Sequence, residues 1–280
     1  MSDERDRGRR VGGGPGGDPD DGPADPPSHP QADDHPQADD HPQADDHDHS
    51  HGRGEWLGRI AGVYDRWSVV YDWNPAMWLV RPARARAVAS MGLRPGDTVV
   101  DMGTGTGANL PHLRAAVGPT GTVVGIDASP GMLANARARV ERAGWENVHL
   151  VRGDVRDPPL DVAVDGIVSS FVLTMFEDAD RLVETWLAYL EDGALATIYA
   201  SPSGRWYGAP VNALLDAYCR VFTAGWGTDF GEAGPGEVLA RRGRKARTAL
   251  TERAARSEHA DALFGLVSRD TGHVRPGDDG

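Results

Sequence analysis

Three glycines at alternate positions, directly after a β-branched segment, limit what this chain can fold into more than any other feature. Val99 and Val100 suit a buried strand. Gly103, Gly105 and Gly107 then allow a turn that side chains would obstruct. The apolar residues behind the turn have the spacing of a helix, whose first free amides can receive an anionic group. The pattern predicts a strand, a turn and a helix that together bind a nucleotide-type ligand.

An acid after the next strand supports the same kind of site. Residues 122–126 predict a second strand, and Asp127 follows it, twenty positions after Gly107 (127 minus 107). A carboxylate there can accept hydrogen bonds from two ribose hydroxyls. Nicotinamide dinucleotides also fit, because Gly103, Gly105 and Ala108 satisfy the weaker form of the dinucleotide fingerprint. A glycine-rich turn that binds no ligand is the third possibility.

The position of a further acid separates these cofactor classes. Asp101 lies two residues before Gly103, and Asp127 ends the following strand. Together with the alternating glycines, this arrangement resembles the class I S-adenosylmethionine-dependent methyltransferases, in particular the branch that methylates quinones and small molecules. The resemblance implies S-adenosylmethionine as the cofactor.

A third strand at residues 148–151 ends in Gly153-Asp154-Val155, which matches the adenine-side motif of this family. The resemblance implies that Asp154 contacts the adenine amino group and that Val155 offers its backbone amide to the ring. An aspartate in a loop is otherwise interpreted as a turn or capping residue. Its place after the third strand favours the cofactor role.

Residues 165–171 predict a fourth strand, and residues 164–173 are similar to the fourth-strand signature of the family. In the quinone-methylating branch a serine matching Ser170 lies at the cofactor, while a small residue packed beneath a helix explains Ser170 equally well. The segment Ser170-Phe171-Val172-Leu173 departs from the Asn/Asp-Pro-Pro-Tyr/Phe signature of enzymes that methylate base amines. This departure argues against DNA as the substrate.

The order of the elements predicts an α/β fold with a doubly wound, mostly parallel, seven-stranded sheet of the Rossmann-like methyltransferase type. Residues 181–190 predict a helix and residues 194–199 a fifth strand. We expect the last strand, residues 262–267, to run antiparallel beside a partner within residues 247–257.

Helices are expected on both sides of this core. Residues 56–73 place Tyr64, Trp67 and Tyr71 on one helical face, and this segment resembles the N-terminal lid helices of quinone and small-molecule methyltransferases. For Trp67 we favour packing on the sheet, whereas packing and a lid role have equal support for Tyr71. Further helices are expected at the ranges 77–91, 206–222 and 237–245, the second of them over the substrate side.

The resemblance also implies a set of cofactor-binding residues. They lie in the predicted strand ends, the turns and helix starts that follow, or the lid, and they are Asp101, Gly103, Gly105, Thr106, Gly107, Asp127, Ala128, Met132, Asp154, Val155, Ser170 and Tyr71. Tyr64, Tyr71, His112 and Tyr207 are the titratable residues near the expected site. We interpret His112 as a surface residue and assign neither a general base nor a metal ligand.

The first 54 residues differ from the rest in composition. They contain 14 acids and five arginines, which gives a charge of −9, and three copies of His-Pro-Gln-Ala-Asp-Asp. Such a segment cannot offset its ordering entropy by burial, so we expect a disordered tail at residues 1–54, a methyltransferase domain at 55–274 and a flexible end at 275–280. The density of His and Asp makes loose metal binding by the tail a second hypothesis.

Several function classes conflict with the composition. No stretch of 18 apolar residues occurs, so we expect no membrane span. Cys219 is the only cysteine, which excludes an intrachain disulfide and favours the cytoplasm. The acidic tail would repel phosphates, so nucleic acid is not expected as a partner.

These observations favour an enzyme that transfers a methyl group from S-adenosylmethionine to a small-molecule or lipid-like acceptor. The acceptor attacks in line at the methyl carbon, which the positive sulfur makes electrophilic. An NAD(P)-dependent oxidoreductase and a metal-buffering or interaction protein acting through its His/Asp tail are the alternatives.

Overall fold

The computed structural model describes residue 62 and the ranges 78–223 and 234–275. The chain divides into two compact units, Met1–Asp45 and Asp46–Gly280, and every described residue belongs to the second. The expected acidic tail and the expected helix at residues 56–73 lie outside the described residues. The same holds for Tyr64, Trp67 and Tyr71.

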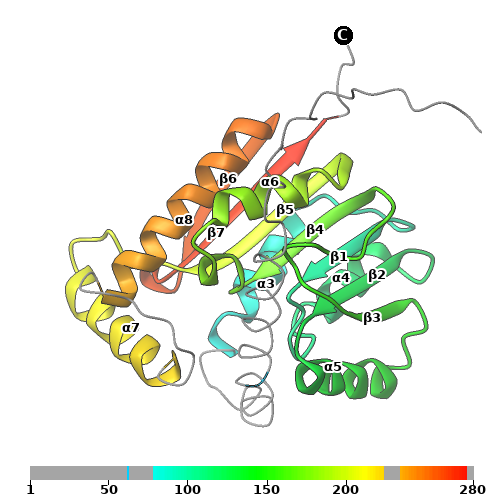
Figure 1. Ribbon diagram of the computed structural model, residues 1–280, viewed down its shortest axis with the longest axis horizontal. Coiled ribbons are helices and arrows are strands. Elements are labelled where there is room, and N and C mark those ends of the chain that lie inside the picture. Colours follow the sequence, from blue (N-terminus) through cyan, green and yellow to red (C-terminus); the bar gives the residue numbers. More distant parts are fainter. Residues whose placement is uncertain (1–61, 63–77, 224–233, 276–280) are drawn as a thin grey trace, which may run out of the picture. The chain divides into compact units, whose positions relative to one another are not determined.

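A seven-stranded sheet forms the centre of the second unit (Figure 1). The strands follow the order β3-β2-β1-β4-β5-β7-β6, and β7 pairs antiparallel with both β5 and β6. The predicted α/β fold with a mostly parallel sheet and an antiparallel last strand is confirmed. The strands are β1 Thr98–Met102, β2 Thr122–Asp127, β3 Val148–Arg152, β4 Val164–Ser170, β5 Leu190–Ala200, β6 Arg256–Ala262 and β7 Val267–Val274.

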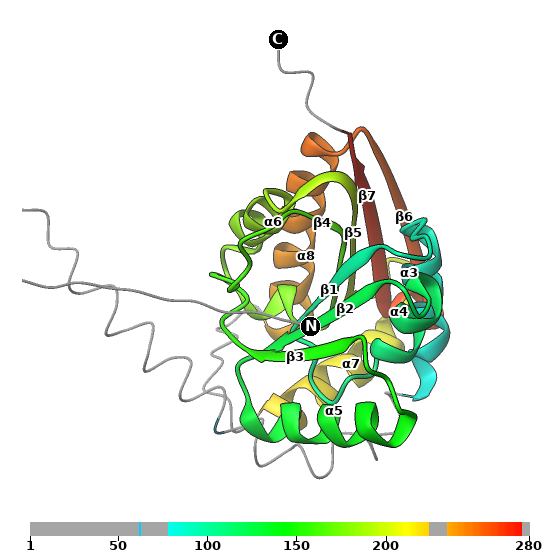
Figure 2. The same cartoon turned by 90° about the vertical axis from the view of Figure 1, so that its right-hand side faces the viewer.

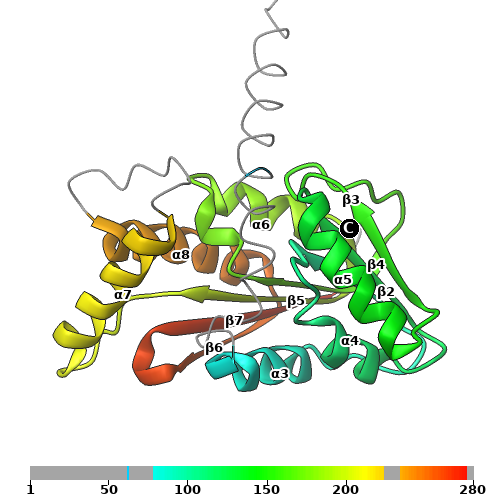
Figure 3. The same cartoon turned by 90° about the horizontal axis from the view of Figure 1, so that it is seen from below.

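Helices cover both faces of this sheet. One core cluster joins the sheet to α3, α4 and α5, and a second joins it to α6 and α8. Figures 2 and 3 show α3 and α4 on one side of the sheet and α6 and α8 on the other. The helices are α3 Arg81–Ser90, α4 Leu110–Val117, α5 Pro130–Ala143, α6 Ala179–Leu187, α7 Gly208–Thr223 and α8 Gly234–Arg253, with 3-10 turns η1 Leu173–Met175 and η2 Leu263–Gly265.

The strand order creates a reversal at the middle of the sheet. From β1 the chain adds β2 and β3 on one side, and it then adds β4 and β5 on the other. In open α/β sheets, ligands bind outside the carboxyl ends of the strands at such a reversal. The carboxyl ends of β1 and β4 are therefore where a site is expected.

The end of the chain departs from the expectation. The predicted short helix at residues 237–245 is too short, because α8 runs for 20 residues over Gly234–Arg253. Gly243 does not break α8, since it packs against the Tyr199 ring, where a Cβ would come within 2.5 Å of a ring carbon. The predicted strand at residues 262–267 and its partner within 247–257 are wrong. The apolar run there forms the turn between β6 and β7, two strands whose polar sequences gave no alternating signal.

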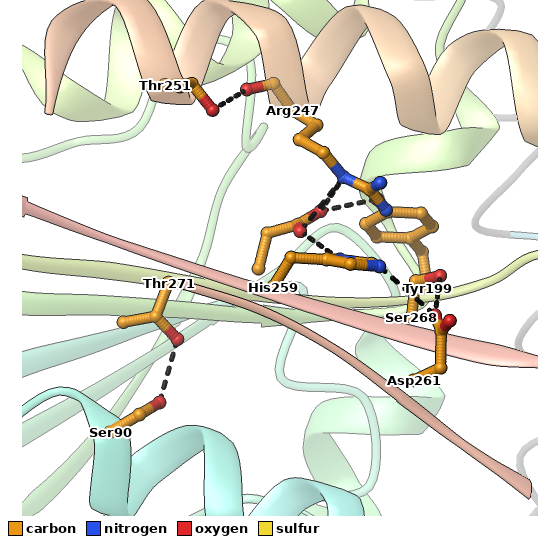
Figure 4. A network of polar contacts seen from close by, with 9 residues as sticks. Ser90, Tyr199, Arg247, Thr251, His259, Asp261, Ser268 and Thr271 are labelled. Atoms are coloured by element: carbon orange, nitrogen blue, oxygen red, sulfur yellow. Dashed lines mark hydrogen bonds and ion pairs between the residues drawn. The ribbon is translucent and has the colours of Figure 1, made fainter. Parts of the chain in front are cut away.

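A buried polar network joins α8 to β5, β6 and β7 (Figure 4). The Tyr199 hydroxyl donates to Asp270, whose side chain is 3% exposed. The Arg247 Nε lies 3.1 Å from the Asp270 Oδ1, and the His259 Nδ1 lies 2.7 Å from the same oxygen. Burial, with the charge of Asp270, raises the pKa of Tyr199, so its hydroxyl remains a donor. Asp261 contacts the other ring nitrogen of His259 at 3.3 Å but is 40% exposed.

We predict that the two carboxylates on His259 differ in their contribution to stability. Replacing Asp270 by Ala removes the acceptor of the buried Tyr199 hydroxyl and of the partly exposed Arg247 and His259, and it should lower the free energy of unfolding by about 2–3 kcal/mol. The matched change Asp261→Ala removes an exposed partner and should cost about 1 kcal/mol or less. Urea unfolding of the two variants measures both values. Equal losses would show that the network does not depend on the burial of Asp270.

Candidate cofactor site

The glycine turn follows β1 and has left-handed backbone conformation at each of its three glycines. The φ angles are 71° at Gly103, 55° at Gly105 and 80° at Gly107. A Cβ on Gly103 would overlap Val172, and a Cβ on Gly107 would lie 2.6 Å from Leu110. A Cβ on Gly105 would meet no atom within 4 Å. The turn is therefore packed at its two ends and open at its centre, where a ligand can approach the backbone.

Hydrogen bonds tie this turn to the end of β2. The amides of Gly103 and Thr104 both donate to the Ile126 carbonyl, at 2.8 and 2.9 Å. The Gly105 amide donates to the Asp127 Oδ2 at 2.8 Å. On α5, the Arg139 Nε donates to the Thr106 carbonyl at 3.0 Å. The glycine turn is consequently hydrogen-bonded both to the end of β2 and to α5.

Asp127 has a structural role that its position in the sequence did not indicate. Besides accepting from Gly105, its Oδ1 accepts from the Ser129 amide at 2.9 Å. Ser129 in turn caps α5, because its hydroxyl accepts from the amide of the buried Met132. The carboxylate thus fixes both the glycine turn and the start of α5, next to Ala128. A carboxylate oxygen can accept two hydrogen bonds, so the bonds to Gly105 and Ser129 are compatible with a ribose-binding role.

Asp101 is completely buried beneath the turn. Its two oxygens accept from the Thr104 hydroxyl and the Asn109 amide, each at 2.8 Å. Burial raises the pKa of Asp101 from 3.8 to about 6, although these bonds and the charge of Arg84 lower it in part. Asp101 therefore supports the turn from inside the protein.

Asn109 connects this acid to two further elements. Its amide nitrogen also donates to the Ser170 hydroxyl at 3.0 Å, and its amide oxygen accepts from the Arg84 Nη1 at 2.9 Å. The Arg84 guanidinium also lies 5.4 Å from the centre of the Phe171 ring. The sequence interpretation missed Arg84, Thr104 and Asn109. Asn109 precedes α4 and resembles a capping residue, but its side chain makes no capping bond and points to Asp101 instead.

The backbone is strained where β4 ends. Phe171 has a φ of 63°, a conformation that costs a non-glycine residue about 1–3 kcal/mol. Its amide donates to the Ile198 carbonyl at 2.7 Å, which ties the turn to β5. The next residue, Val172, fills the space beside Gly103. Strain of this kind concentrates at functional sites, and here it adjoins Ser170 and the glycine turn.

The turn after β3 is fixed by two side chains that the sequence interpretation did not include. The Arg156 guanidinium holds Asp154, with Nη2 2.8 Å from Oδ2 and Nε 3.0 Å from the same oxygen. The buried Trp186 on α6 donates to the Val155 carbonyl at 2.7 Å. The Arg156 backbone amide and Nε also donate to the Asp154 Oδ1, at 3.0 and 3.1 Å. These contacts fix Asp154 and Val155 at the carboxyl end of β3.

The remaining candidates divide between the two ends of the site. His112, on the first turn of α4, is only partly exposed, and burial, with the charges of Arg81 and Arg84, lowers its pKa. Tyr207 lies beyond β5 and contacts the rings of Trp206 and Phe264. Within the described part of the chain, no cluster of three or more His, Cys, Asp or Glu side chains could hold a metal ion.

Comparisons with known proteins agree with this geometry. A family model described as a methyltransferase domain matches residues 99–193. Phosphatidylethanolamine N-methyltransferase of Cereibacter sphaeroides is 32% identical over 180 residues, which cover 62% of this chain and 83% of that relative. Demethylmenaquinone methyltransferase of Staphylococcus aureus is 40% identical over 121 residues, or 42% of this chain and 47% of that relative.

Other relatives share a smaller part of their length. Arsenite methyltransferase of Halobacterium salinarum is 32% identical over 114 residues, which cover 40% of this chain but 29% of that protein.

Among solved structures, a chain from the complex of the Haloferax volcanii Trm112 methyltransferase activator with a methyltransferase has a TM-score of 0.52 at 21% identity. This match covers 79% of our chain and all of that one. The pyocyanin biosynthetic protein PhzM has a TM-score of 0.51 at 21% identity over 69% of this chain and 54% of its own.

The doubly wound sheet, the open glycine turn and the acids at neighbouring strand ends define an α/β cofactor-binding enzyme. With the relatives above, the family is established: the chain belongs to the class I S-adenosylmethionine-dependent methyltransferases of the small-molecule type. Its cofactor is S-adenosylmethionine. Within the described residues, no helix has the length and apolar character needed to cross a bilayer.

We predict that Asp101 makes stability depend on pH in an unusual direction. Between pH 3.8 and about pH 6, Asp101 retains in the folded state a proton that it has released in the unfolded chain. The contribution of Asp101 to the free energy of unfolding therefore decreases as the pH rises. The variant Asp101→Asn keeps the shape without titrating. Its free energy of unfolding, relative to the unmodified chain, should rise by up to about 3 kcal/mol between pH 4 and pH 7. Chemical unfolding at both pH values tests this, and an unchanged difference would contradict it.

Proposed function

We propose that this chain methylates a small, lipid-like acceptor bound at the carboxyl edge of its sheet. The observation that most supports methyl transfer is the order of the donor-binding polar groups along that edge. Asp154 follows β3, Asp127 ends β2, the glycine turn follows β1 and Ser170 ends β4. Neighbouring strands lie about 4.8 Å apart, so these four strand ends span about 14 Å. An extended nucleoside joined through sulfur to an amino acid suits such a row.

Each cofactor residue then has a role in the proposal. Asp127 receives the ribose hydroxyls, while Asp154 and the Val155 amide receive the adenine. The open centre of the glycine turn receives the amino-acid part. Asp101, which was predicted to bind the cofactor, is completely buried and acts instead by supporting the glycine turn. The remaining contacts are proposed for Gly103, Gly105, Thr106, Gly107, Ala128, Met132, Ser170 and, outside the described residues, Tyr71. We also infer a methyltransferase domain over residues 55–274 and, from the single cysteine Cys219, a cytoplasmic location.

The bound cofactor supplies an electrophilic methyl group, which an acceptor nucleophile takes in line as the carbon–sulfur bond breaks and S-adenosylhomocysteine departs. The chain's residues contribute chiefly by position. Holding two reactants in attack geometry can supply about 7–11 kcal/mol of the barrier. The bonds from Ile126 and Asp127 to the glycine turn, and the buried contact between Asn109 and Ser170, provide that rigidity.

Two observations favour a lipid-like acceptor over a polar one. The relative of which the chain covers 83% is a phosphatidylethanolamine N-methyltransferase, and another relative methylates demethylmenaquinone, as their names state. In addition, the segments that follow β5 and β6 expose Trp206 and Phe264 at the carboxyl edge of the sheet. An apolar acceptor can bury its surface against such side chains.

We predict that a methyl group on Gly105 blocks cofactor binding. Gly105→Ala places its Cβ in the open centre of the turn and should weaken S-adenosylhomocysteine binding at least tenfold, measured by calorimetry. Gly144→Ala is the matched control, because Gly144 ends α5 with a φ of 65° and equally open surroundings. Both variants should lose about 1–2 kcal/mol of stability from left-handed backbone strain. Tight NADH binding without any response to S-adenosylhomocysteine would contradict the site.

We predict transfer of label from methyl-labelled S-adenosylmethionine into chloroform-extractable product. The full chain is supplied with phosphatidylethanolamine or a quinol in detergent micelles, and Gly105→Ala serves as the inactive control. Label in the organic phase that depends on Gly105 would support a lipid-like acceptor. Label only in water-soluble products of a cell extract would contradict that acceptor class while leaving the methyltransferase assignment intact.

A further inference from the structure

Exposed aromatic side chains gather beyond the cofactor turn, at the same edge of the sheet. Trp206, just after β5, is 95% exposed, and Phe264, in the turn between β6 and β7, is 71% exposed. Tyr207 joins them, because its ring centre lies 5.4 Å from that of Trp206 and 6.5 Å from that of Phe264, edge-on in both cases. Solvent exposure of this size is unfavourable for a tryptophan unless another surface covers it.

The start of α3 extends this surface. Trp78 and Leu79 are 65% and 61% exposed, and the adjacent Val80 shares a core cluster with Leu263, the neighbour of Phe264. Both segments therefore border the same core cluster. We define the aromatic edge as the exposed Trp78, Leu79, Trp206 and Phe264 together with the partly buried Tyr207.

The backbone is strained where it presents Phe264. Three successive residues have positive φ, with 48° at Leu263, 61° at Phe264 and 90° at Gly265. The Ser203 hydroxyl stabilises this turn by donating to the Phe264 carbonyl at 2.7 Å. The turn directs Leu263 toward the core cluster and leaves Phe264 in solvent. Two non-glycine residues in this conformation cost about 1–3 kcal/mol each, so the outward position of Phe264 is maintained against strain.

The charge around the aromatic edge differs from that of the chain. The formal net charge of the chain is −13, of which −9 lies in residues 1–54 and −4 in residues 55–280. The three segments that carry the aromatic edge, residues 78–90, 201–215 and 262–269, contain no acid. Four of their five arginines reach solvent: Arg81, Arg86, Arg205 and Arg269, whereas Arg84 is buried beneath the glycine turn. The Arg81 guanidinium lies 5.5 Å from the Trp78 ring centre. Cations beside exposed aromatic rings are the composition of surfaces that rest on membranes.

We propose that the aromatic edge docks this enzyme on the interfacial layer of a lipid bilayer that contains anionic headgroups. The proposal rests on the proposed function for its purpose, since it places the acceptor side of the enzyme against the phase that holds a lipid-like acceptor. Tryptophan, tyrosine and phenylalanine partition into the interfacial layer, and arginines near the surface add about 1 kcal/mol each toward anionic lipid. If this surface instead bound a second copy of the chain, we would expect an apolar surface without this excess of arginines.

The test measures binding of the chain to lipid vesicles, with neither cofactor nor methyl acceptor added. The full chain is floated with vesicles of phosphatidylcholine containing one quarter phosphatidylglycerol at 0.15 M salt, where charges beyond about 8 Å are screened. Trp206→Ser should lower the partition coefficient about tenfold, since it removes one large apolar group from the lipid. Adding Phe264→Gly should lower it further, and Gly also relieves the local strain, so the variant remains folded.

The matched control is Val162→Ser. Val162 is 60% exposed but precedes β4, at the amino edge of the sheet, and its loss should leave the partition coefficient unchanged. Equal effects of Val162 and Trp206, or no flotation of the unmodified chain, would overturn the proposal. So would a concentration-dependent dimer that Trp206→Ser disrupts while vesicle binding stays unchanged. Because methyl transfer to micellar acceptor is measured separately, failure of docking is distinguishable from failure of the proposed function.

Discussion

The hydrogen bonds between the glycine turn and the end of β2 are the constraint on which the rest of the site depends. One carbonyl, that of Ile126, receives two amides, and one carboxylate, that of Asp127, receives the Gly105 amide. These bonds fix the position of the turn relative to the carboxyl ends of β1 and β2. Because Asp127 also holds the Ser129 amide, the same group sets where α5 begins. A residue expected only to bind ribose therefore also determines the local backbone.

Beneath the turn, a buried network replaces apolar packing. Asp101, Asn109, Ser170 and Arg84 come from β1, the start of α4, β4 and α3, and each is at most 7% exposed. A buried charge costs desolvation free energy, which raises the pKa of Asp101 to about 6. The gain is directional: the Asn109 amide bonds to Asp101, Ser170 and Arg84 together, so the four elements have one relative arrangement. Apolar contacts would stabilise the same layer without defining that arrangement as closely.

The sequence predicted the cofactor half of the fold and missed much of the rest for physical reasons. The strands β1 to β5 carry β-branched or apolar runs whose burial requires a strand, and their turns contain Gly103, Gly105 and Gly107. By contrast, β6 and β7 carry many charged residues, among them His259 and Asp270 of the buried network, so no apolar period marks these strands. The partners of Asn109 lie 25 residues away at Arg84 and 61 away at Ser170, and no local pattern reports such contacts. The motif around Asp154 can be recognised in the sequence. The ion pair between Asp154 and Arg156 and the hydrogen bond from Trp186 to Val155 become evident only in the structure.

The two ends of the carboxyl edge are built on different principles. At the donor end, hydrogen bonds and buried charge fix a turn whose shape must match one cofactor. Toward β5, β7 and β6, side chains such as Trp206 and Phe264 face solvent. Among the described residues, the non-glycine residues with positive φ are Phe171, Leu263 and Phe264, and all three follow strand ends at this edge. Strain is thus confined to the turns that border the donor site and the exposed surface, while the sheet beneath them keeps regular pairing. The turns after β5 and β6 can therefore vary without disturbing the donor turn, because the bonds that hold the donor turn involve neither Trp206 nor Leu263 nor Phe264.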